Sequence, residues 1–352
     1  MKGISIIKKT GATFTPSKLA DYLSNKLIGY YGDLSNKIIV DPACGDGSLL
    51  VSIAKQSNSD IEKLVGFDTN EKYIIQTKKN LAEIGNSNYE IENEDFLEIS
   101  SRQNDLFLNN TFYNYADIVI ANPPYVRTQN LGSEKSKQIA KNFNLSGKVD
   151  LYYPFLIGMT NILKKGGILG VITSNRYLTT KSGSDIRKFL LENYDILEII
   201  DLGDSKLFDA AVLPAIFIGR KKTSKTQLHS ICKFVKIYET TNASKKTIQS
   251  VDSIYDILSY DKNGVYCIEK KLYKYTTGIL THLSNETDIW KLTNETENKL
   301  IDIINKHTYC YVRDKFKVRV GIKSCADNVF LNPDLNNNIL SEQELYRPMI
   351  SR

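Results

Sequence analysis

Between Ile38 and Lys222 the chain alternates short apolar runs with longer segments of helical periodicity. The apolar runs are rich in β-branched residues and are bounded by polar or glycine positions, which is typical of buried strands. They predict strands at 38–41, 64–68, 89–92, 117–121, 167–173, 196–201 and 214–220. Apolar positions of helical period predict helices at 47–56, 71–84, 151–163 and 184–192. Strands separated by helix-length segments favour a mostly parallel, doubly wound α/β sheet with helices on both faces.

The pattern changes on both sides of this region. Ahead of it, residues 18–28 have an amphipathic helical pattern, and Ser17 stands where an N-terminal cap is expected. After it, R-K-K-T-S-K-T at 220–226 is polar and basic, like the exit from a domain. Residues 228–352 are rich in Asn, Lys, Tyr and Asp and have fewer long apolar runs. We therefore predict one domain over residues 1–222 and a second region over residues 223–352.

Composition limits the class of protein. Of the 352 residues, 41% are hydrophobic and 24% are charged, as in soluble globular proteins. No run approaches the roughly 18 apolar residues that span a bilayer, so no membrane association is expected. The five cysteines form no C-x-x-C pair and lie apart from the three histidines, which argues against a metal site and for a reducing cytoplasm. The formal charge of +6 suits a polyanionic partner, although a solvated surface of mixed Lys and Glu gives similar totals.

The first predicted strand runs into a glycine-rich turn, D-P-A-C-G-D-G-S at 41–48. Gly45 and Gly47 allow a tight turn and a close approach of the backbone to a ligand. The turn lacks the G-K-[ST] of a phosphate loop, and Asp46 would repel a pyrophosphate. An acidic turn suits a ligand with positive charge, such as an amino acid amine or a sulfonium. An ordinary tight turn without a ligand is the alternative.

Acidic residues follow the next two predicted strands. Asp68 stands some twenty residues after the glycines, where an acidic side chain can hold two ribose hydroxyls. It could instead cap the helix that starts near Glu71. Asp95 and Phe96 follow the third strand and could accept the amino group of an adenine and cover its ring. As single residues they also suit a surface and a core position, and both interpretations stay open.

The fourth predicted strand ends on A-N-P-P-Y-V at 121–126. Asn122 offers a side-chain carbonyl, and the prolines have no N–H, so the local backbone presents acceptors only. Clustered carbonyls select an amino group, and the ring of Tyr125 selects a planar heterocycle. The segment therefore suits the exocyclic amine of a base, with a plain Asn-Pro-Pro turn as the alternative. Its place beside the glycine turn, where the strand order of a doubly wound sheet reverses, favours a ligand site.

Taken in order, D-P-A-C-G-D-G, G-F-D, E-D-F and A-N-P-P-Y-V resemble S-adenosylmethionine-dependent amino-methyltransferases, and more narrowly the N6-adenine DNA methyltransferases of restriction–modification systems. G-A-T-F-T-P at 11–16, ahead of the glycine turn, resembles the gamma group of these enzymes. The resemblance covers about residues 9–222. It implies a Rossmann-like seven-stranded methyltransferase sheet with helices on both faces and S-adenosyl-L-methionine as cofactor. The implied reaction is site-specific methylation of N6 of an adenine flipped out of double-stranded DNA.

The resemblance also implies roles for individual residues. The methionine part of the cofactor would contact Thr15, Asp41, Ala43 and Cys44. The ribose would contact Asp68, and the adenine would contact Asp95, Phe96 and Phe155. The whole predicted cofactor set is Thr15, Pro16, Asp41, Pro42, Ala43, Cys44, Gly45, Gly47, Asp68, Asp95, Phe96, Asn122 and Phe155. The predicted catalytic set is Asn122, Pro123, Pro124, Tyr125 and Phe208. Phe208 would stack on the base, with a core position in a hairpin as the alternative. The sulfonium already activates the methyl group, so no metal is needed.

Three other functions share parts of this pattern. The same amine clamp serves enzymes that methylate RNA bases and enzymes that methylate a glutamine amide in a protein. Phe208 and the long C-terminal region count against the protein-modifying group, which needs no second base-stacking aromatic residue. A non-catalytic DNA-binding relative is the third alternative, and the intact Asn122, Tyr125 and glycine turn count against it.

The C-terminal region resembles the start of a target-recognition domain. The similar segments are V-R-V-G-I-K-S-C-A-D-N-V-F-L at 318–331 and E-L-Y-R-P-M-I-S-R at 344–352, so we expect the chain to end within that domain. The expected partners are double-stranded DNA and either a separate specificity subunit or a cognate restriction endonuclease, since no room for a nuclease precedes the cofactor segment. Two interpretations stay open for the basic residues of this region, which could face DNA phosphates or could simply be solvated. These residues are Arg313, Lys315, Lys317, Arg319 and Lys323.

Overall fold

The computed structural model describes residues 14–57, 59–101, 112–125, 131–143, 145, 150–205, 207–208, 213–224, 231–241, 248–280 and 289–317. The chain forms two compact units, Met1–Asn298 and Lys299–Arg352. In the second unit the structure describes the end of helix α11 (Glu295–His307) and the short helix α12 (Val312–Lys315). The first unit contains the sheet and the candidate site.

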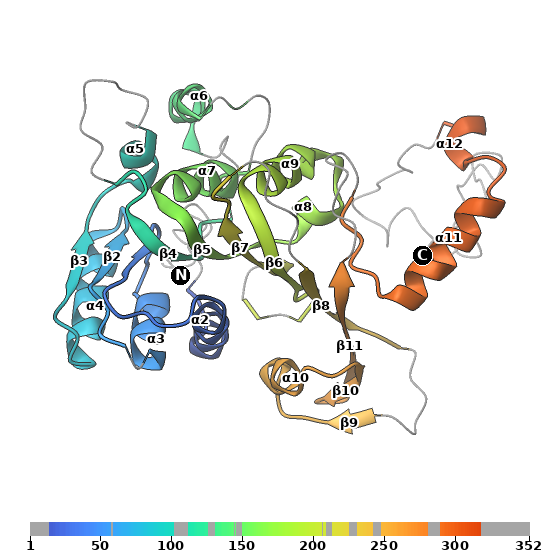
Figure 1. Cartoon of the computed structure of the whole chain (residues 1–352), viewed down its shortest axis with the longest axis horizontal. Coiled ribbons are helices and arrows are strands. Elements are labelled where there is room, and N and C mark those ends of the chain that lie inside the picture. The colour runs from blue at the N-terminus through green and yellow to red at the C-terminus, as the bar shows by residue number, and fades with distance from the viewer. Residues whose placement is uncertain are drawn as a thin grey trace, which may run out of the picture. The chain divides into compact units, whose positions relative to one another are not determined.

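One mixed sheet organises the first unit, and its order is β3-β2-β1-β4-β5-β7-β6-β8-β11-β10-β9 (Figure 1). The strands are β1 (Ile38–Asp41), β2 (Lys63–Phe67), β3 (Tyr89–Glu92), β4 (Ala116–Ala121), β5 (Leu163–Ser174), β6 (Tyr194–Asp201), β7 (Pro214–Lys221), β8 (Cys232–Glu239), β9 (Ile248–Ser250), β10 (Gly264–Ile268) and β11 (Lys271–Leu280). All seven predicted strands are present.

The sheet is mostly parallel, as predicted, but it contains antiparallel pairs beyond β5. Strands β1 to β5 pair in parallel, but β7 runs antiparallel to both β5 and β6, and β11 is antiparallel to β8 and β10. Only a dozen residues, 202–213, connect β6 to β7. Antiparallel neighbours can be joined by such a short connection, whereas parallel neighbours need a crossover.

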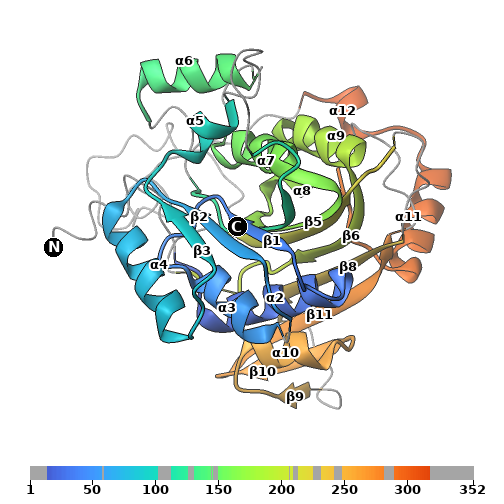
Figure 2. The same cartoon turned by 60° about the vertical axis from the view of Figure 1, so that its left-hand side comes forward.

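Helices cover both faces of the sheet, as predicted. One face carries α2 (Ser17–Tyr31), α3 (Ser48–Gln56) and α4 (Glu71–Glu83), and the other α5 (Phe96–Ser101), α7 (Tyr152–Ile162) and α9 (Ser184–Asn193) (Figures 1 and 2). Along β4, Ile118 and Ile120 belong to the core beneath α2 to α4, and Val119 and Ala121 to the opposite core. Successive side chains of a strand point to opposite faces, so a strand covered on both sides is apolar throughout.

The connections add further helices, namely α6 (Ser133–Asn142), α8 (Arg176–Thr179), η3 (Lys181–Gly183) and α10 (Ile254–Tyr260). The predicted cap of α2 is wrong, because Pro16 is the N-cap residue and no side chain bonds the helix end. The Pro16 carbonyl accepts from the N–H groups of Leu19 and Ala20 at 2.9 and 3.0 Å. Ser17 is therefore already helical, and its hydroxyl is past the position from which a cap acts.

The sheet does not end at residue 222. Strand β8 pairs in parallel with β6, from Glu198↔Lys233 to Asp201↔Lys236, and β11, β10 and β9 follow it. The predicted boundary thus falls between two strands of one sheet, and the first compact unit reaches Asn298. The assignment of residues 223–352 to target recognition remains a prediction.

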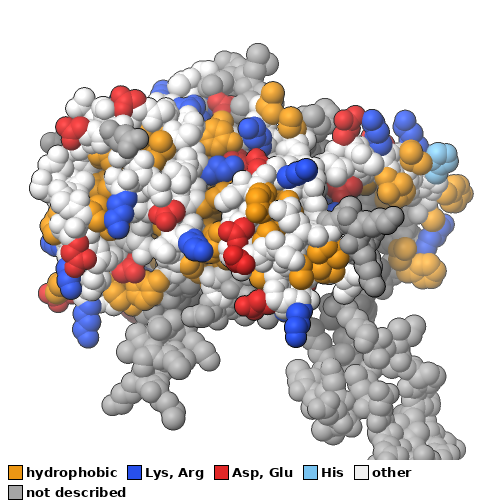
Figure 3. Space-filling model, turned by 90° about the horizontal axis from the view of Figure 1, so that it is seen from below, with side chains coloured by type: hydrophobic (Ala, Val, Ile, Leu, Met, Phe, Trp, Pro, Cys, Tyr) orange, Lys and Arg blue, Asp and Glu red, His pale blue; other side chains and the backbone are white. Residues whose placement is uncertain are grey.

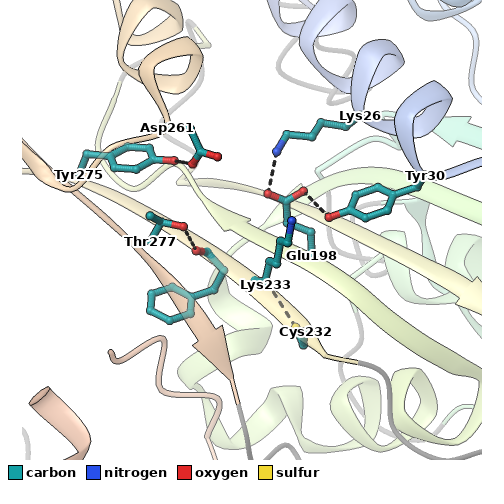
Figure 4. Close-up of polar contacts among 9 residues, drawn as sticks. Lys26, Tyr30, Glu198, Cys232, Lys233, Asp261, Tyr275 and Thr277 are labelled. Atoms are coloured by element: carbon teal, nitrogen blue, oxygen red, sulfur yellow. Dashed lines mark hydrogen bonds and ion pairs between the residues drawn. The ribbon is translucent and has the colours of Figure 1, made fainter. Parts of the chain in front are cut away.

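A buried carboxylate joins α2 to this part of the sheet. Glu198, on β6, is 2% exposed and accepts from Lys26 Nζ at 2.9 Å and from Tyr30 Oη at 3.0 Å (Figure 4). A buried charge is costly unless it is paired and hydrogen-bonded, so this network favours one placement of α2. Thr15 and Pro16 stand immediately before α2 and are placed with it.

Candidate active site

The residues predicted to act together follow four neighbouring strands. Asp41 ends β1, Asp68 follows β2, Asp95 comes shortly after β3 and Asn122 follows β4. These strands are parallel, so their carboxyl ends lie along one edge of the sheet. From β1 the chain first adds β2 and β3 on one side of the sheet, and it then adds β4 on the other side of β1. Such a reversal is where open α/β sheets bind ligands.

The glycine turn after β1 is held in place by helix α4. Thr77 Oγ1 donates to the carbonyl of Gly45 at 2.8 Å, and Asn80 Nδ2 donates to the carbonyl of Asp46 at 2.8 Å. Gly47 has a φ of 80°, and a Cβ there would lie 2.7 Å from the Thr77 methyl group. Only glycine suits that position, because it accepts both the left-handed backbone and the close approach of α4.

Asp41 presents a buried carboxylate oxygen that lacks a partner among the described residues. The side chain is 1% exposed, and Oδ1 accepts from the Ala43 N–H at 3.0 Å, whereas Oδ2 has no hydrogen bond. Burial raises the pKa of Asp41 to about 8, and the negative charges of Asp68 and Asp46 add to the effect. An unpaired buried acceptor is costly. A cationic ligand at this oxygen would remove that cost.

A pocket lies at this turn. Its lining includes six members of the predicted cofactor set, namely Thr15, Asp41, Ala43, Cys44, Gly45 and Asn122. Pro42 is buried beside it and Pro16 is half-buried. Burial and the neighbouring Asp41 raise the pKa of the Cys44 thiol, so Cys44 is a neutral wall rather than a nucleophile. The Asp41 oxygen without a described partner and the acidic Asp46 in the lining fit the cationic amine of S-adenosyl-L-methionine.

Asp68 supports the turn from the next strand. Its Oδ2 accepts from the Gly45 N–H at 3.1 Å, and its Oδ1 accepts from the Asn70 N–H at 2.8 Å. Burial raises the pKa of Asp68. The cap of α4 is Asn70, whose side chain accepts from the Lys72 N–H, so the alternative that Asp68 caps this helix is wrong. A role for Asp68 in holding a ribose stays a prediction.

The three residues predicted to hold an adenine lie together. Asp95 Oδ1 accepts from the Leu97 N–H at 3.0 Å, and Oδ2 pairs with Lys135 Nζ of α6 at 2.7 Å. Phe96 and Phe155 are buried and stacked, with ring centroids 5.7 Å apart and planes 23° apart. The rings cover each other, so an adenine would lie beside this stack rather than between its members. Their role in cofactor binding stays a prediction.

The Asn-Pro-Pro-Tyr segment joins the cofactor pocket to an aromatic pair. Asn122 is 9% exposed, and its Nδ2 donates to Thr15 Oγ1 at 3.0 Å. Tyr125 Oη donates to Asn122 Oδ1 at 2.6 Å. The rings of Tyr125 and Phe208 meet at a centroid distance of 6.2 Å and an angle of 60°. Pro123 is buried and Pro124 half-buried. Thr15 and Tyr125 thus meet at one amide, and Phe208 packs against the ring of Tyr125.

A second polar cluster was missed by the sequence patterns. The carboxylate of Asp201 is buried at the end of β6 and accepts from Asn175 Nδ2 at 2.9 Å, from Tyr238 Oη at 2.8 Å and from the Gly203 N–H at 3.1 Å. Asp201 ends a predicted strand as Asp41 does, so the same rule could have singled it out. Asn175 and Tyr238 carry no comparable signal in the sequence.

Two further properties concern the described residues alone. Within them, no group of three or more His, Cys, Asp or Glu side chains is arranged to hold a metal ion. None of the helices that the structure describes combines the length and the apolar character required to cross a bilayer.

Solved structures of restriction–modification proteins share this fold. A chain from a type I restriction–modification complex has a TM-score of 0.58 and 12% identity over 84% of this chain and 65% of its own. The type IIG restriction endonuclease BpuSI has a TM-score of 0.55 and 19% identity over 92% of this chain and 38% of its own. At these identities the likeness concerns the fold alone, and it agrees with the predicted α/β methyltransferase fold.

Sequence comparison identifies the family. The type II methyltransferase M.BanIII of Aneurinibacillus aneurinilyticus is 39% identical over 98% of this chain. The chain spans 62% of that relative's own length. Residues 23–208, more than half of the chain, match the model of the Eco57I restriction-modification methylases. The chain therefore belongs to the Eco57I restriction-modification methylase family.

Proposed function

We propose that this chain transfers a methyl group from S-adenosyl-L-methionine to the N6 amine of an adenine flipped out of duplex DNA. One observation carries the proposal. The Asn122 amide lies between Thr15, which lines the cofactor pocket, and the aromatic pair Tyr125 and Phe208. A methyl donor on one side and a planar amine on the other would therefore meet at this amide.

The cofactor pocket supplies binding and orientation. When bound, the cofactor supplies a methyl group already activated by its sulfonium. Asp41 Oδ2 would accept from the cationic amine, and the turn fixed by Thr77 would place the backbone of Gly45 and Gly47 against the ligand. The neutral wall at Cys44 excludes water without competing for the methyl group. These residues act by holding the reacting atoms in line, which is a large contribution to rate.

The target side selects an amine on a planar ring. Asn122 Oδ1 and the carbonyl of Pro123 would accept the two amine hydrogens, and Tyr125 and Phe208 would stack on or against the base. Flipping a base out of a duplex costs on the order of a few kcal/mol. Stacking on aromatic side chains returns about 1–3 kcal/mol per base. The aromatic pair therefore offsets a large part of that cost.

The two carbonyls favour the transition state over the ground state. The N6 lone pair of adenine is delocalised into the ring, so the amine is a poor nucleophile. As the nitrogen attacks, it gains positive charge and its hydrogens become more acidic. Hydrogen bonds to Asn122 Oδ1 and the Pro123 carbonyl then strengthen. Neither carbonyl is basic enough to remove the proton beforehand, so it leaves to water after transfer.

The alternatives are an RNA base, a protein glutamine and a non-catalytic role. The pairing of Tyr125 with Phe208 supports a planar base over a glutamine amide. The Asp41 oxygen that lacks a partner supports a cofactor site over a purely structural turn. The chain spans 62% of the length of M.BanIII. A recognised DNA sequence, a specificity subunit and a cognate endonuclease would be properties of a whole protein of that length, so none of them is assigned to this chain.

The distribution of charged side chains on the surface bears on where DNA would bind. On the described part of the face in Figure 3, Lys and Arg side chains stand among Asp and Glu side chains. Binding to the phosphate backbone favours clustered basic side chains. The mixed charges on this described part of the surface therefore offer the phosphate backbone no basic cluster.

Transfer of a tritiated methyl group tests the proposal. The protein is incubated with labelled cofactor and, separately, with unmodified duplex DNA, RNA and protein, and the labelled atom is identified. We expect label at N6 of adenine in DNA, and label in RNA or on glutamine would replace the proposal. Asn122→Ala serves as the control: transfer should be lost because the target amine loses an acceptor, whereas S-adenosylhomocysteine should still bind through the other residues of the pocket.

A further inference from the structure

Thr15 stands between the cofactor pocket and the amide of Asn122. It is 8% exposed and lines the same pocket as Asp41 and Cys44. Its Oγ1 also accepts from Asn122 Nδ2 at 3.0 Å, across 107 positions of sequence. The adjoining Pro16 carbonyl is fixed to the first turn of α2, which the buried Glu198 network holds against the sheet (Figure 4). Thr15 is thus attached to a firmly placed element.

The reaction requires one orientation of the Asn122 amide. A side-chain amide has an acceptor end and a donor end. The target amine donates and does not accept, because its lone pair is delocalised into the ring. If the amide turned round, its NH₂ would face the target amine, donor against donor. In the structure Tyr125 Oη donates to Oδ1 at 2.6 Å, so the acceptor end already faces the target side.

A hydroxyl at position 15 completes that orientation. A threonine hydroxyl can accept from the amide nitrogen, and this leaves Asn122 Nδ2 hydrogen-bonded in a nearly water-free place. Without it, the reactive orientation would lose this buried hydrogen bond, and the loss would destabilise that orientation. The bond therefore matters most when Oδ1 is engaged by the target.

We propose that Thr15 is a positioning residue for Asn122, in addition to being a wall of the cofactor pocket. It holds the amide nitrogen and directs the carbonyl oxygen to the target amine. This inference rests on the proposed role of Asn122. The hydroxyl that borders the donor pocket then also orders the acceptor side, so one side chain connects the two halves of the site.

Two substitutions separate this role from cofactor binding. Thr15→Val keeps the shape of the side chain and removes the hydroxyl, whereas Thr15→Ser keeps the hydroxyl. We expect Thr15→Val to lower the single-turnover transfer rate at saturating cofactor and DNA by about 10- to 100-fold, the effect of removing one partner from a buried hydrogen bond. The dissociation constant of S-adenosylhomocysteine, measured by calorimetry, should change less than about threefold, and Thr15→Ser should restore most of the rate.

A second measurement does not depend on transfer. Urea unfolding of Thr15→Val, Asn122→Ala and the double variant forms a cycle. We expect the double variant to lose less stability than the two single losses combined, because each single change already breaks the same bond. Additive losses would contradict the bond, and an unchanged saturated rate with weakened cofactor binding would leave Thr15 as a pocket wall only. If the wild type methylates no DNA, the proposed function fails while the cycle still decides whether Thr15 positions Asn122.

Discussion

At the scale of single residues, the oxygen that Asn122 would offer to a target amine already accepts a hydrogen bond from Tyr125 of the same segment. Tyr125 Oη holds Asn122 Oδ1 at 2.6 Å, and the ring edge meets Phe208. In the proposed reaction an entering amine would compete with this hydroxyl for Oδ1 or share the oxygen through its second lone pair. The hydroxyl would then weaken the hold on the base, whereas the ring would strengthen it by stacking.

Two variants of Tyr125 distinguish these effects. In Tyr125→Phe the ring remains and the competing hydroxyl is gone, so we expect a larger fraction of the target base to be extruded. The measurement is the fluorescence of 2-aminopurine at the target position, which should be higher than with the wild type. In Tyr125→Ala the stacking surface is lost, and the extruded base should be destabilised by about 1–3 kcal/mol. Cofactor affinity should stay close to that of the wild type in both. Equal behaviour of the two variants would count against a separate role of the hydroxyl.

Asp41 predicts a pH dependence of cofactor binding. Burial raises its pKa to about 8, so below this pH the free protein holds the side chain neutral. A raised carboxyl pKa contributes stability that is present in acid and is lost as the pH rises toward 8. A cationic ligand favours the ionised form, so binding below pH 8 should release a proton from Asp41.

Calorimetry measures this linkage directly. Between pH 6 and 8 the affinity for S-adenosylhomocysteine should rise by up to about tenfold per pH unit. Titrations in phosphate and in Tris, which differ in ionisation enthalpy, should show proton release. Asp41→Asn has no proton to lose, so the affinity should be low and the buffer dependence absent. A wild-type pH profile in Asp41→Asn would remove Asp41 from the cofactor site.

The sequence identified the residues that end strands, and it could not identify the residues that hold them. Asp41, Asp68 and Asn122 were found because the end of a strand places a side chain at the edge of the sheet. Thr77 and Asn80 hold the glycine turn from a helix some thirty residues later. Nothing in a helical pattern shows which polar side chain faces a loop, so these partners required the structure.

At the scale of elements, the loop after β6 is fixed at both ends. Near its start, the Gly203 N–H donates to Asp201 Oδ1, and Asp204 accepts from the Glu239 N–H at 2.8 Å. At its end, the carbonyl of Leu213 accepts from the Asn175 N–H at 2.8 Å. This loop carries Phe208, so β8, which lies beyond the predicted first domain, helps to place a predicted base-stacking residue.

Removal of one hydroxyl on β8 tests this connection. Tyr238→Phe deletes the donor to Asp201 Oδ2 and leaves the ring, so we expect looser placement of Phe208 and a lower 2-aminopurine signal, with cofactor affinity unchanged. Tyr266→Phe is the matched control, because it removes a hydroxyl that bonds the Lys262 carbonyl next to β10. If both variants retain the wild-type signal, β8 does not position the loop.

Periodicity located the predicted strands but not their directions. The run at 214–220 reads as a buried strand whether it pairs in parallel or not, and only the short connection 202–213 indicates an antiparallel neighbour. At the start of β8, the buried Cys232 and Phe234 flank the exposed Lys233, an alternation that is present in the sequence. The polar composition of residues 228–352 concealed it, because composition averages over the alternation that defines a strand.

At the scale of the whole molecule, the compact unit that contains the candidate site extends beyond the predicted boundary at residue 222. Phe234, Val235 and Ile237 of β8 are at most 1% exposed, and Trp290 and Leu292 are buried in the core shared with α8 and α9. The Trp290 N–H also donates to the Leu178 carbonyl at 2.8 Å. These contacts make residues 223–298 part of the unit that holds the site.

Two shortened chains decide between the boundaries. A chain ending at Lys222 loses β8 and exposes the edge of β6, and three buried side chains alone contribute about 1.5–3 kcal/mol each. That loss is comparable with the whole stability of a domain, about 5–15 kcal/mol, so we expect no cooperative thermal unfolding and a tendency to aggregate through the open edge. A chain ending at Asn298 keeps the compact unit, and it should unfold cooperatively and bind S-adenosylhomocysteine like the full chain. A stable, cofactor-binding chain that ends at Lys222 would restore the boundary that the composition predicted.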